Sequence, residues 1–197
     1  GENTSTQANW TRNGFLPTNF AFLDDGGFLL ADGYGAHCIH QFDKDGKWIR
    51  LFGGTGKGEG KFNLCHGLWV DQRKGREPSI IVTDRSHNTL QYLTMDGEYM
   101  ETLTGYGLPA NIDIYKNIMM IPELKARITL LDENNKMVGR LGEAVERVNS
   151  VKDLRRKPEL WIDGQFVHPH DACFDSEGNI FVAEWVQTGR ITKLTRI

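Results

Sequence analysis

The sequence predicts an all-β fold built from a repeated four-stranded unit. Short apolar segments with alternating polarity dominate the chain, Asp- and Gly-rich turns separate them, and the same order of segments recurs four times. Hydrophobic residues make up 39% of the 197 residues and charged residues 25%. This composition is ordinary for a folded globular protein, and it excludes a disordered, collagen-like or coiled-coil chain.

Charge and hydropathy exclude two classes of partner. The chain has 23 Lys and Arg against 26 Asp and Glu, for a formal net charge of −3. It therefore has no basic footprint for nucleic acid or for an anionic membrane surface. No apolar run approaches the ~18 residues that a transmembrane helix needs. We expect no nucleic-acid partner and no membrane span.

The first copy of the unit contains four segments typical of strands, at residues 20–22, 28–31, 38–42 and 48–52. Turns of one kind lie at residues 24–27, 43–46, 94–97 and 175–178. In these turns Asp can accept backbone hydrogen bonds and Gly can adopt a positive φ, so they predict hairpins. Three scattered cysteines predict neither a disulfide framework nor a structural zinc site. We expect Cys38 and Cys173, which lie in apolar segments, to be small core residues.

The other copies align with the first at the start of the first strand. Segments 17–22, 65–70, 109–114 and 169–174 share this position, and the second strands end in an acid: Asp32, Asp84, Glu123 and Glu184. Successive copies begin 48, 44 and 60 residues apart, counted at Thr18, His66, Ala110 and His170. A unit of this length with four short strands is typical of a β-propeller blade. The longest interval contains a charged insertion near residues 143–159, for which we expect a loop or a short surface helix.

The four blades, at about residues 13–62, 63–106, 107–164 and 165–197, are expected to form a single β-propeller domain. The last copy stops after its third strand, at residues 191–194, and residues 1–12 are typical of a polar loop entering a blade. A propeller closes on itself to remove its sheet edges. We therefore expect part of a six-bladed ring, whose remaining blades come from a missing segment. A self-contained four-bladed ring is the alternative.

Equivalent positions in successive blades form rings beside the central channel of a propeller. His66 and His170 share one such position, and Asp171 follows directly. The two imidazoles could converge on an axial metal ion, for which Zn²⁺ is favoured, whereas a carboxylate suits Ca²⁺. In the alternative interpretation, His66 and His170 cap strands or hydrogen-bond the backbone in a wet channel.

The loops after the second strands are expected at the same mouth of the channel. The loop that carries Tyr34 is one residue longer than the loop that begins with Arg85, and the extra residue could aim the phenol at the channel. A tyrosine beside a metal can act as a base, and an arginine can bind a carboxylate or stabilise developing negative charge. Alternatively, Tyr34 is a packing residue and Arg85 pairs with Asp84 or with a neighbouring acid. His168 is either an extra ligand or a polar residue at the mouth.

The remaining histidines, His37, His40 and His87, are expected at the surface or at sheet edges. They lie in loop or strand positions that follow the second strands.

These segments resemble NHL-type blades, and residues 13–197 resemble the later blades of the lyase domain of peptidylglycine α-amidating enzymes. The resemblance rests on four motifs: Asp32-Gly33-Tyr34, Gly60-Lys61-Phe62 leading into Cys65-His66-Gly67-Leu68, Asp84-Arg85, and Pro169-His170-Asp171 followed by residues 178–182. That family has a six-bladed propeller with a zinc ion held by three histidines and a structural calcium ion. It cleaves the carbinolamide of peptidyl-α-hydroxyglycine to an amide and glyoxylate.

The resemblance implies that His66 and His170 are zinc ligands, Asp171 a calcium ligand, Tyr34 the catalytic base and Arg85 an active-site arginine. A third zinc ligand would lie in blades outside this sequence. The chain departs from the family at His168, where the family has methionine, and at Gly35, where it has cysteine.

The expected function is that of a metal-dependent lyase which cleaves a carbinolamide or a similar hydroxylated small molecule or peptide. The resemblance also implies an extracytoplasmic or secreted setting. The first alternative is a non-catalytic NHL propeller that binds a protein or glycan at its channel mouth. The second is a structural ring that Ca²⁺ makes rigid.

Overall fold

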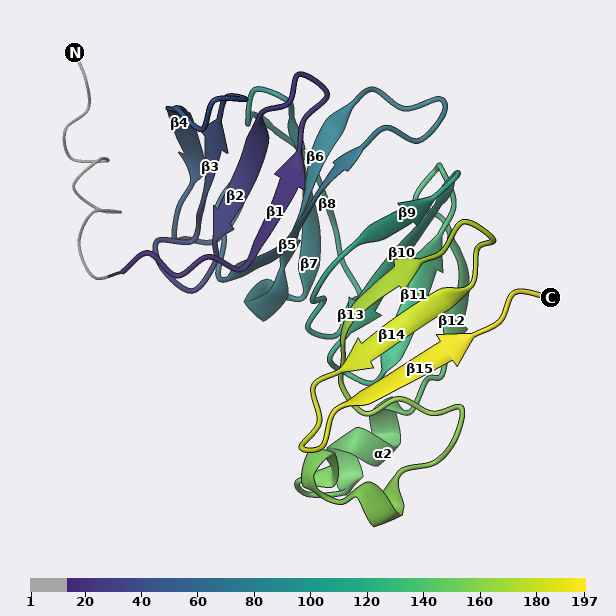
Figure 1. Cartoon of the computed structure of the whole chain (residues 1–197). Helices are drawn as coiled ribbons and strands as arrows, with labels where there is room; N and C mark the ends of the chain where they lie inside the picture. Colours follow the sequence, from purple (N-terminus) through teal and green to yellow (C-terminus); the bar gives the residue numbers. More distant parts are fainter. Residues whose placement is uncertain (1–13) are drawn as a thin grey trace. The chain divides into compact units, whose positions relative to one another are not determined.

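The computed structural model describes residues 14–197, and the predicted N-terminal loop at residues 1–12 lies outside this range. The described chain divides into two compact units. The first unit comprises residues 14–71 and 78–105, and the second comprises residues 72–77 and 106–197. Each unit contains two antiparallel sheets whose strands are neighbours in sequence order (Figure 1).

The first unit holds two four-stranded sheets. One consists of β1 (Asn19–Phe22), β2 (Phe28–Asp32), β3 (Cys38–Phe42) and β4 (Trp48–Gly53). The other consists of β5 (Cys65–Asp71), β6 (Ser79–Asp84), β7 (Thr89–Thr94) and β8 (Tyr99–Leu103), and the 3₁₀ turn η1 (Arg85–His87) joins β6 to β7.

The second unit holds a four-stranded and a three-stranded sheet. The first consists of β9 (Asp113–Tyr115), β10 (Ile118–Glu123), β11 (Arg127–Leu131) and β12 (Met137–Leu141). The second consists of β13 (Pro169–Phe174), β14 (Ile180–Glu184) and β15 (Arg190–Leu194). Such consecutive up-and-down sheets are the blades of a β-propeller, so the predicted all-β propeller class is confirmed. The last sheet ends after its third strand, as predicted.

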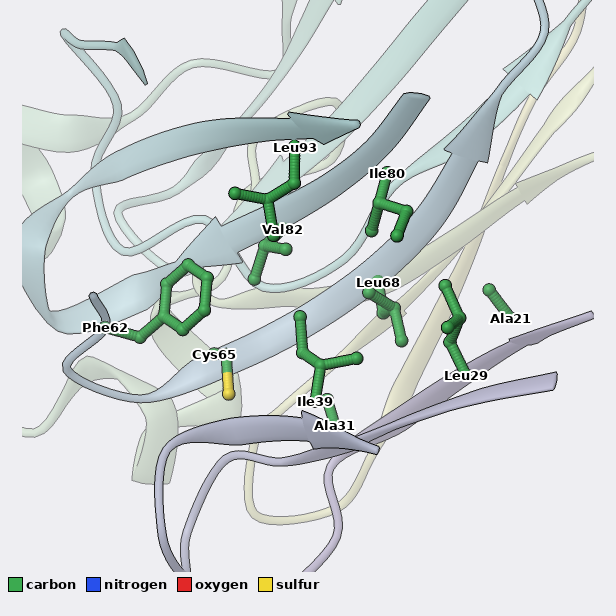
Figure 2. Close-up of a cluster of buried hydrophobic side chains, with 10 residues drawn as sticks. All are labelled: Ala21, Leu29, Ala31, Ile39, Phe62, Cys65, Leu68, Ile80, Val82 and Leu93. Atoms are coloured by element: carbon green, nitrogen blue, oxygen red, sulfur yellow. The ribbon is translucent and has the colours of Figure 1, made fainter. Parts of the chain in front are cut away.

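Apolar side chains from facing sheets form the core of each unit. In the first unit β1 and β2 pack against β5, and Figure 2 shows the cluster that results. Its buried members are Ala21, Leu29, Ala31, Ile39, Phe62, Cys65, Leu68, Ile80, Val82 and Leu93. In the second unit β10 packs against β13. The corresponding core there includes Met120, Ile128, Phe166, Ala172 and Val182.

Two of the four predicted Asp turns share one hydrogen-bond pattern. Asp43 Oδ1 accepts the N–H groups of residues 45 and 47, and Asp175 Oδ1 accepts those of residues 177 and 179. The sequence analysis missed a further copy of this turn at Asp132. The position that glycine occupies elsewhere, as Gly46 does with a φ of 78°, is filled there by Asn135 with a φ of 60°. Asparagine tolerates this left-handed conformation better than most residues.

The insertion between β12 and β13 is partly helical. It contains α2 (Val145–Ser150) and two 3₁₀ turns, η2 (Leu154–Arg156) and η3 (Pro158–Leu160). The short helix that the sequence left open is therefore present. No helix within residues 14–197 is both long and apolar enough to cross a membrane.

Two residue-level expectations were wrong. Cys173 is exposed, because alternation along β13 points its side chain away from the core that Ala172 joins. His40 was expected at the surface, but it is fully buried within β3.

Candidate active site and buried polar cluster

The acids that end the second strands hold the loops that lead into their own blades. All four carboxylates are buried, and each accepts a backbone N–H from the segment just before the first strand. The donors are Leu16 to Asp32 (2.7 Å), Asn63 to Asp84 (2.8 Å), Gly107 to Glu123, and Val167 to Glu184 (2.6 Å). These bonds fix the path of each first strand at the channel position where His66 and His170 were predicted.

The charge of this acid is balanced differently from blade to blade. Glu123 pairs with Arg127 at 2.9 Å, and Glu184 pairs with Arg190. Asp84 lies 2.6 Å from His87 Nδ1. Arg127 and Arg190 lie opposite their acids on the neighbouring third strand of the blade. In the first blade, Cys38 occupies this position opposite Asp32.

Asp32, Cys38 and His40 form a buried polar cluster that could hold a metal ion. Their potential ligand atoms lie within 4.8 Å of one another, and carboxylate, thiolate and imidazole are all metal ligands. The Sγ of Cys38 lies 3.5 Å from Nε2 of His40, whose Nδ1 accepts a hydrogen bond from Trp48 Nε1 at 3.3 Å. Burial, followed by the nearby Asp32 carboxylate, raises the pKa of the Cys38 thiol to about 12. Burial also lowers the pKa of His40.

Sequence reasoning missed this cluster. A signal was present: an acid ends one strand, and Cys and His occupy alternate positions at the start of the next strand, so all three face one side. Alternation alone does not say which face of a strand is buried, and the sequence analysis expected His40 at the surface or at a sheet edge.

Three of the predicted site residues come together in the first unit. Arg85 Nη2 donates a hydrogen bond of 2.6 Å to the Tyr34 hydroxyl, and its guanidinium carbon lies 5.3 Å from the centre of the tyrosine ring. The rings of Tyr34 and His66 meet edge to face, with centroids 5.8 Å apart. Tyr34 is 49% exposed and His66 is 6% exposed. The phenol thus joins a buried imidazole to a guanidinium at a surface that a substrate could reach.

Local backbone features bring these side chains together. Gly33 lets the Tyr34 loop approach β5, because a Cβ at this position would lie 2.1 Å from the Cys65 carbonyl oxygen. Thr18 Oγ1 donates to the same carbonyl at 2.8 Å. The ladder between β5 and β6 shifts its register across His66. Such an irregularity re-aims a side chain.

The proposed pairing of Arg85 with Asp84 is not found. Asp84 instead accepts hydrogen bonds from the Asn63 backbone and from Gln91, and it lies against His87. The guanidinium of Arg85 is instead directed at Tyr34.

His170 and Asp171 lie side by side on β13 in the second unit, across a register shift like the one at His66. His170 is half-buried. Asp171 is exposed, and its Oδ1 accepts from Asn111 Nδ2 at 2.6 Å and from its neighbour Ala172 N at 2.8 Å. Its Oδ2 has no hydrogen-bond donor within residues 14–197. The convergence of His66 with His170 stays a prediction.

The other histidines have structural contacts. His168 Nδ1 donates to the Leu124 carbonyl at 2.6 Å, and burial lowers its pKa. His37 Nδ1 accepts the N–H of Leu64 at 2.5 Å. Both are partly buried.

Solved structures with a similar fold include two lyases. No protein-family model matches the sequence. A streptogramin B lyase superposes with a TM-score of 0.59 at 13% identity, over 95% of this chain and 57% of that one. Virginiamycin B lyase from Staphylococcus aureus superposes with a TM-score of 0.57 at 13% identity, over 90% of this chain and 55% of that one. A chain of a nidogen/laminin complex superposes with a TM-score of 0.61 at 17% identity, over 88% of this chain and 57% of that one. This chain thus spans less than two thirds of each, and at these identities the likeness shows the fold.

Proposed function

We propose that this chain carries the active site of a metal-dependent β-propeller lyase, which cleaves a carbinolamide or a similar hydroxylated small substrate. The observation that carries the proposal is the contact of Tyr34 with both Arg85 and His66. The lyases among the structures of similar fold support it. Because the chain spans about half of those structures, we also propose that a further segment supplies the remaining blades of a six-bladed ring.

The residues suggest how a carbinolamide would be cleaved. Tyr34, as the general base, removes the proton of the substrate hydroxyl. The C–O bond then becomes a carbonyl as the C–N bond breaks, and the amide nitrogen takes up the proton that Tyr34 removed, which returns Tyr34 to its phenolate form. Arg85 donates to the Tyr34 oxygen and stabilises the phenolate that acts as the base, before it takes the proton. Its other N–H groups can orient a substrate carboxylate.

The donor set suits the proposed metal ions. His66 and His170 offer imidazole nitrogens, which Zn²⁺ prefers, and Oδ2 of Asp171 is a hard oxygen suited to Ca²⁺. When bound, zinc would supply Lewis-acid activation of the substrate hydroxyl. The Asp32, Cys38 and His40 cluster is a second candidate metal site, where binding at His40 Nε2 would require the ring to give up its hydrogen bond from Trp48.

Turnover by the complete protein, which includes the proposed further segment and is supplied with zinc and calcium, tests the proposal. A peptidyl-α-hydroxyglycine and a streptogramin B serve as substrates, and product formation is followed by chromatography. We expect Tyr34→Phe to lower kcat by about 10²- to 10⁴-fold, the usual contribution of a general acid or base. Tyr99→Phe is the matched control, because Tyr99 is likewise a hydrogen-bonded tyrosine of the first unit, where it contacts Thr102.

Absence of turnover with both substrates, or equal rates for Tyr34→Phe and Tyr99→Phe, would overturn the lyase proposal. A non-catalytic propeller that binds a protein or glycan would then be the second candidate. The similarity to a chain of a nidogen/laminin complex favours this alternative.

A further inference from the structure

The insertion between β12 and β13 borders an open pocket of about 280 Å³ in the second unit. We call it the insertion pocket. Its walls include Leu124, Lys125, Val148, Arg155, His168 and Trp185. These residues come from the β10–β11 loop, from α2 and η2, and from the segments that flank β13 and β14. The connections from β4 to β5 and from β8 to β9 contain no such insertion, so the pocket is an addition to the repeat.

Arg155 brings an unpaired cation to the pocket. Its guanidinium carbon lies 3.4 Å from the centre of the Trp185 ring, which places the planar group flat against the indole. The Nε atom is buried and has no hydrogen-bond acceptor, and no described residue accepts a hydrogen bond from the rest of the guanidinium. A buried donor without an acceptor is costly. The edge of an arginine that carries Nε matches the two oxygens of a carboxylate.

His168 brings an acceptor to the same ring. Its centroid lies 6.2 Å from that of Trp185. Because a carbonyl oxygen only accepts, the contact of Nδ1 with Leu124 O places a proton on Nδ1. The neutral ring then presents Nε2 as an acceptor, and Nε2 has no partner among residues 14–197. A ligand hydroxyl can supply the missing donor.

The remaining walls set the character of the ligand. Leu124 and Val148 make part of the lining apolar, and Val151 and Leu154 extend it. Lys125 adds a second positive charge, against one negative charge from Asp153. The pocket thus combines an apolar lining and a net positive charge with one vacant charged donor and one vacant acceptor.

We propose that the insertion pocket binds a small hydroxy acid with an apolar side group. The carboxylate pairs with Arg155, the hydroxyl donates to His168 Nε2, and the side group lies against the apolar wall. The site is separate in the chain from Tyr34 and Arg85, and it does not depend on the proposed lyase activity.

Calorimetric titration of the full chain with phenyllactate tests this site. We expect saturable binding, and weaker binding both of 3-phenylpropanoate, which lacks the hydroxyl, and of phenyllactamide, which lacks the charge. Arg155→Gln should raise Kd by about 10- to 100-fold, as expected for loss of a charged hydrogen bond. Arg156→Gln is the matched control, since it makes the same charge change at the exposed neighbouring residue and should leave Kd unchanged.

A second variant separates ligand binding from collapse of the insertion. Arg155→Lys keeps a cation at Trp185 but removes the planar fork, so it should weaken phenyllactate binding by about tenfold, while the circular dichroism spectrum stays unchanged. The proposal is overturned if phenyllactate gives no saturable heat up to about 10 mM, a Kd weaker than any specific site would show. It is equally overturned if 3-phenylpropanoate or phenyllactamide binds as well as phenyllactate, or if the Arg155 variants bind as the wild type does.

Discussion

The buried acid that ends each second strand has the same role in every blade, but its charge is balanced by different residues. Glu184 is buried, and its partner Arg190 is only 19% exposed in its side chain. Removing one member of a buried pair leaves a charge that neither water nor a counterion stabilises. At this position the arginine therefore matters for stability because of the acid that it would leave behind.

We predict that Arg190→Ala lowers the free energy of unfolding by about 3–5 kcal/mol. Arg50→Ala provides the comparison, because the ion-pair partner of Arg50, Asp96, is exposed, so its loss should cost less than that of Arg190. Urea denaturation of both variants measures the difference. Equal losses in the two variants would mean that burial of the acid does not decide the cost.

The three cysteines should differ sharply in reactivity. Cys38 and Cys65 are buried, and burial raises the pKa of both thiols. Partial burial and nearby carboxylates also raise the pKa of the Cys173 thiol, but Cys173 is exposed, so the reagent can reach it. Only the thiolate is a good nucleophile. A chromogenic disulfide reagent should therefore modify one thiol per folded chain, and Cys173→Ser should abolish the reaction. Rapid modification of two or three thiols in the native protein would contradict the structure.

The alternation of side chains along a strand explains why the sequence could not show that Cys38 is buried and Cys173 exposed. Each run predicts a strand, but a shift of one residue exchanges its two faces. On β13 the core side chain is Ala172, so its neighbour Cys173 faces away. The same ambiguity hid the burial of His40.

At the scale of elements, the turns depend on backbone conformation more than on packing. Gly46 has a φ of 78°, and an added Cβ would meet no atom within 4 Å. A substitution there therefore isolates the cost of a left-handed conformation. Gly139 on β12 has equally open space without a positive φ, which makes it a matched control.

We predict that Gly46→Ala lowers the free energy of unfolding by about 1–2 kcal/mol. Gly139→Ala should be neutral or slightly stabilising, because alanine restricts the unfolded chain more than glycine does. Denaturation midpoints of the two variants measure the effect. A neutral Gly46→Ala variant would show that the turn can adopt another conformation at no cost.

Strands and turns could be predicted because alternation and Asp–Gly pairs are local signals. Residues 17–22 and 169–174 contain β1 and β13, and residues 65–70 contain all of β5 except its last residue. In residues 109–114, however, the strand β9 is delayed to Asp113–Tyr115. The repeat predicted that the loops of Tyr34 and Arg85 lie at the same mouth of the channel, but it did not predict the contacts that Tyr34 makes with Arg85 and His66. The insertion pocket could not be predicted, since it depends on how a non-repeated segment folds over its neighbours.

At the scale of the whole molecule, the repeat predicted the propeller class. The burial of two histidines makes the stability of the folded chain sensitive to acid. Burial lowers the pKa of His40 in the first unit and of His168 in the second from the usual 6.5. Below pH 6.5, these two histidines bind protons in the unfolded chain but remain unprotonated in the folded chain until the pH reaches their lower folded pKa values. The free energy of unfolding therefore falls as the pH drops from 6.5 toward the folded pKa values, and these histidines contribute no pH dependence above that window.

We predict that the wild type loses stability between pH 7.5 and pH 5.5, and that His40→Gln loses less. Glutamine is a suitable replacement because Gln91 holds the equivalent place on β7, two residues after the start of the third strand of its blade. The part of the stability loss that His40→Gln removes cannot exceed about 1.4 kcal/mol for each unit by which burial lowers the pKa of His40. Urea denaturation at the two pH values measures it. Because the carboxylates titrate mostly at lower pH, an unchanged loss in His40→Gln would show that His40 takes up its proton as readily in the folded chain as in the unfolded one.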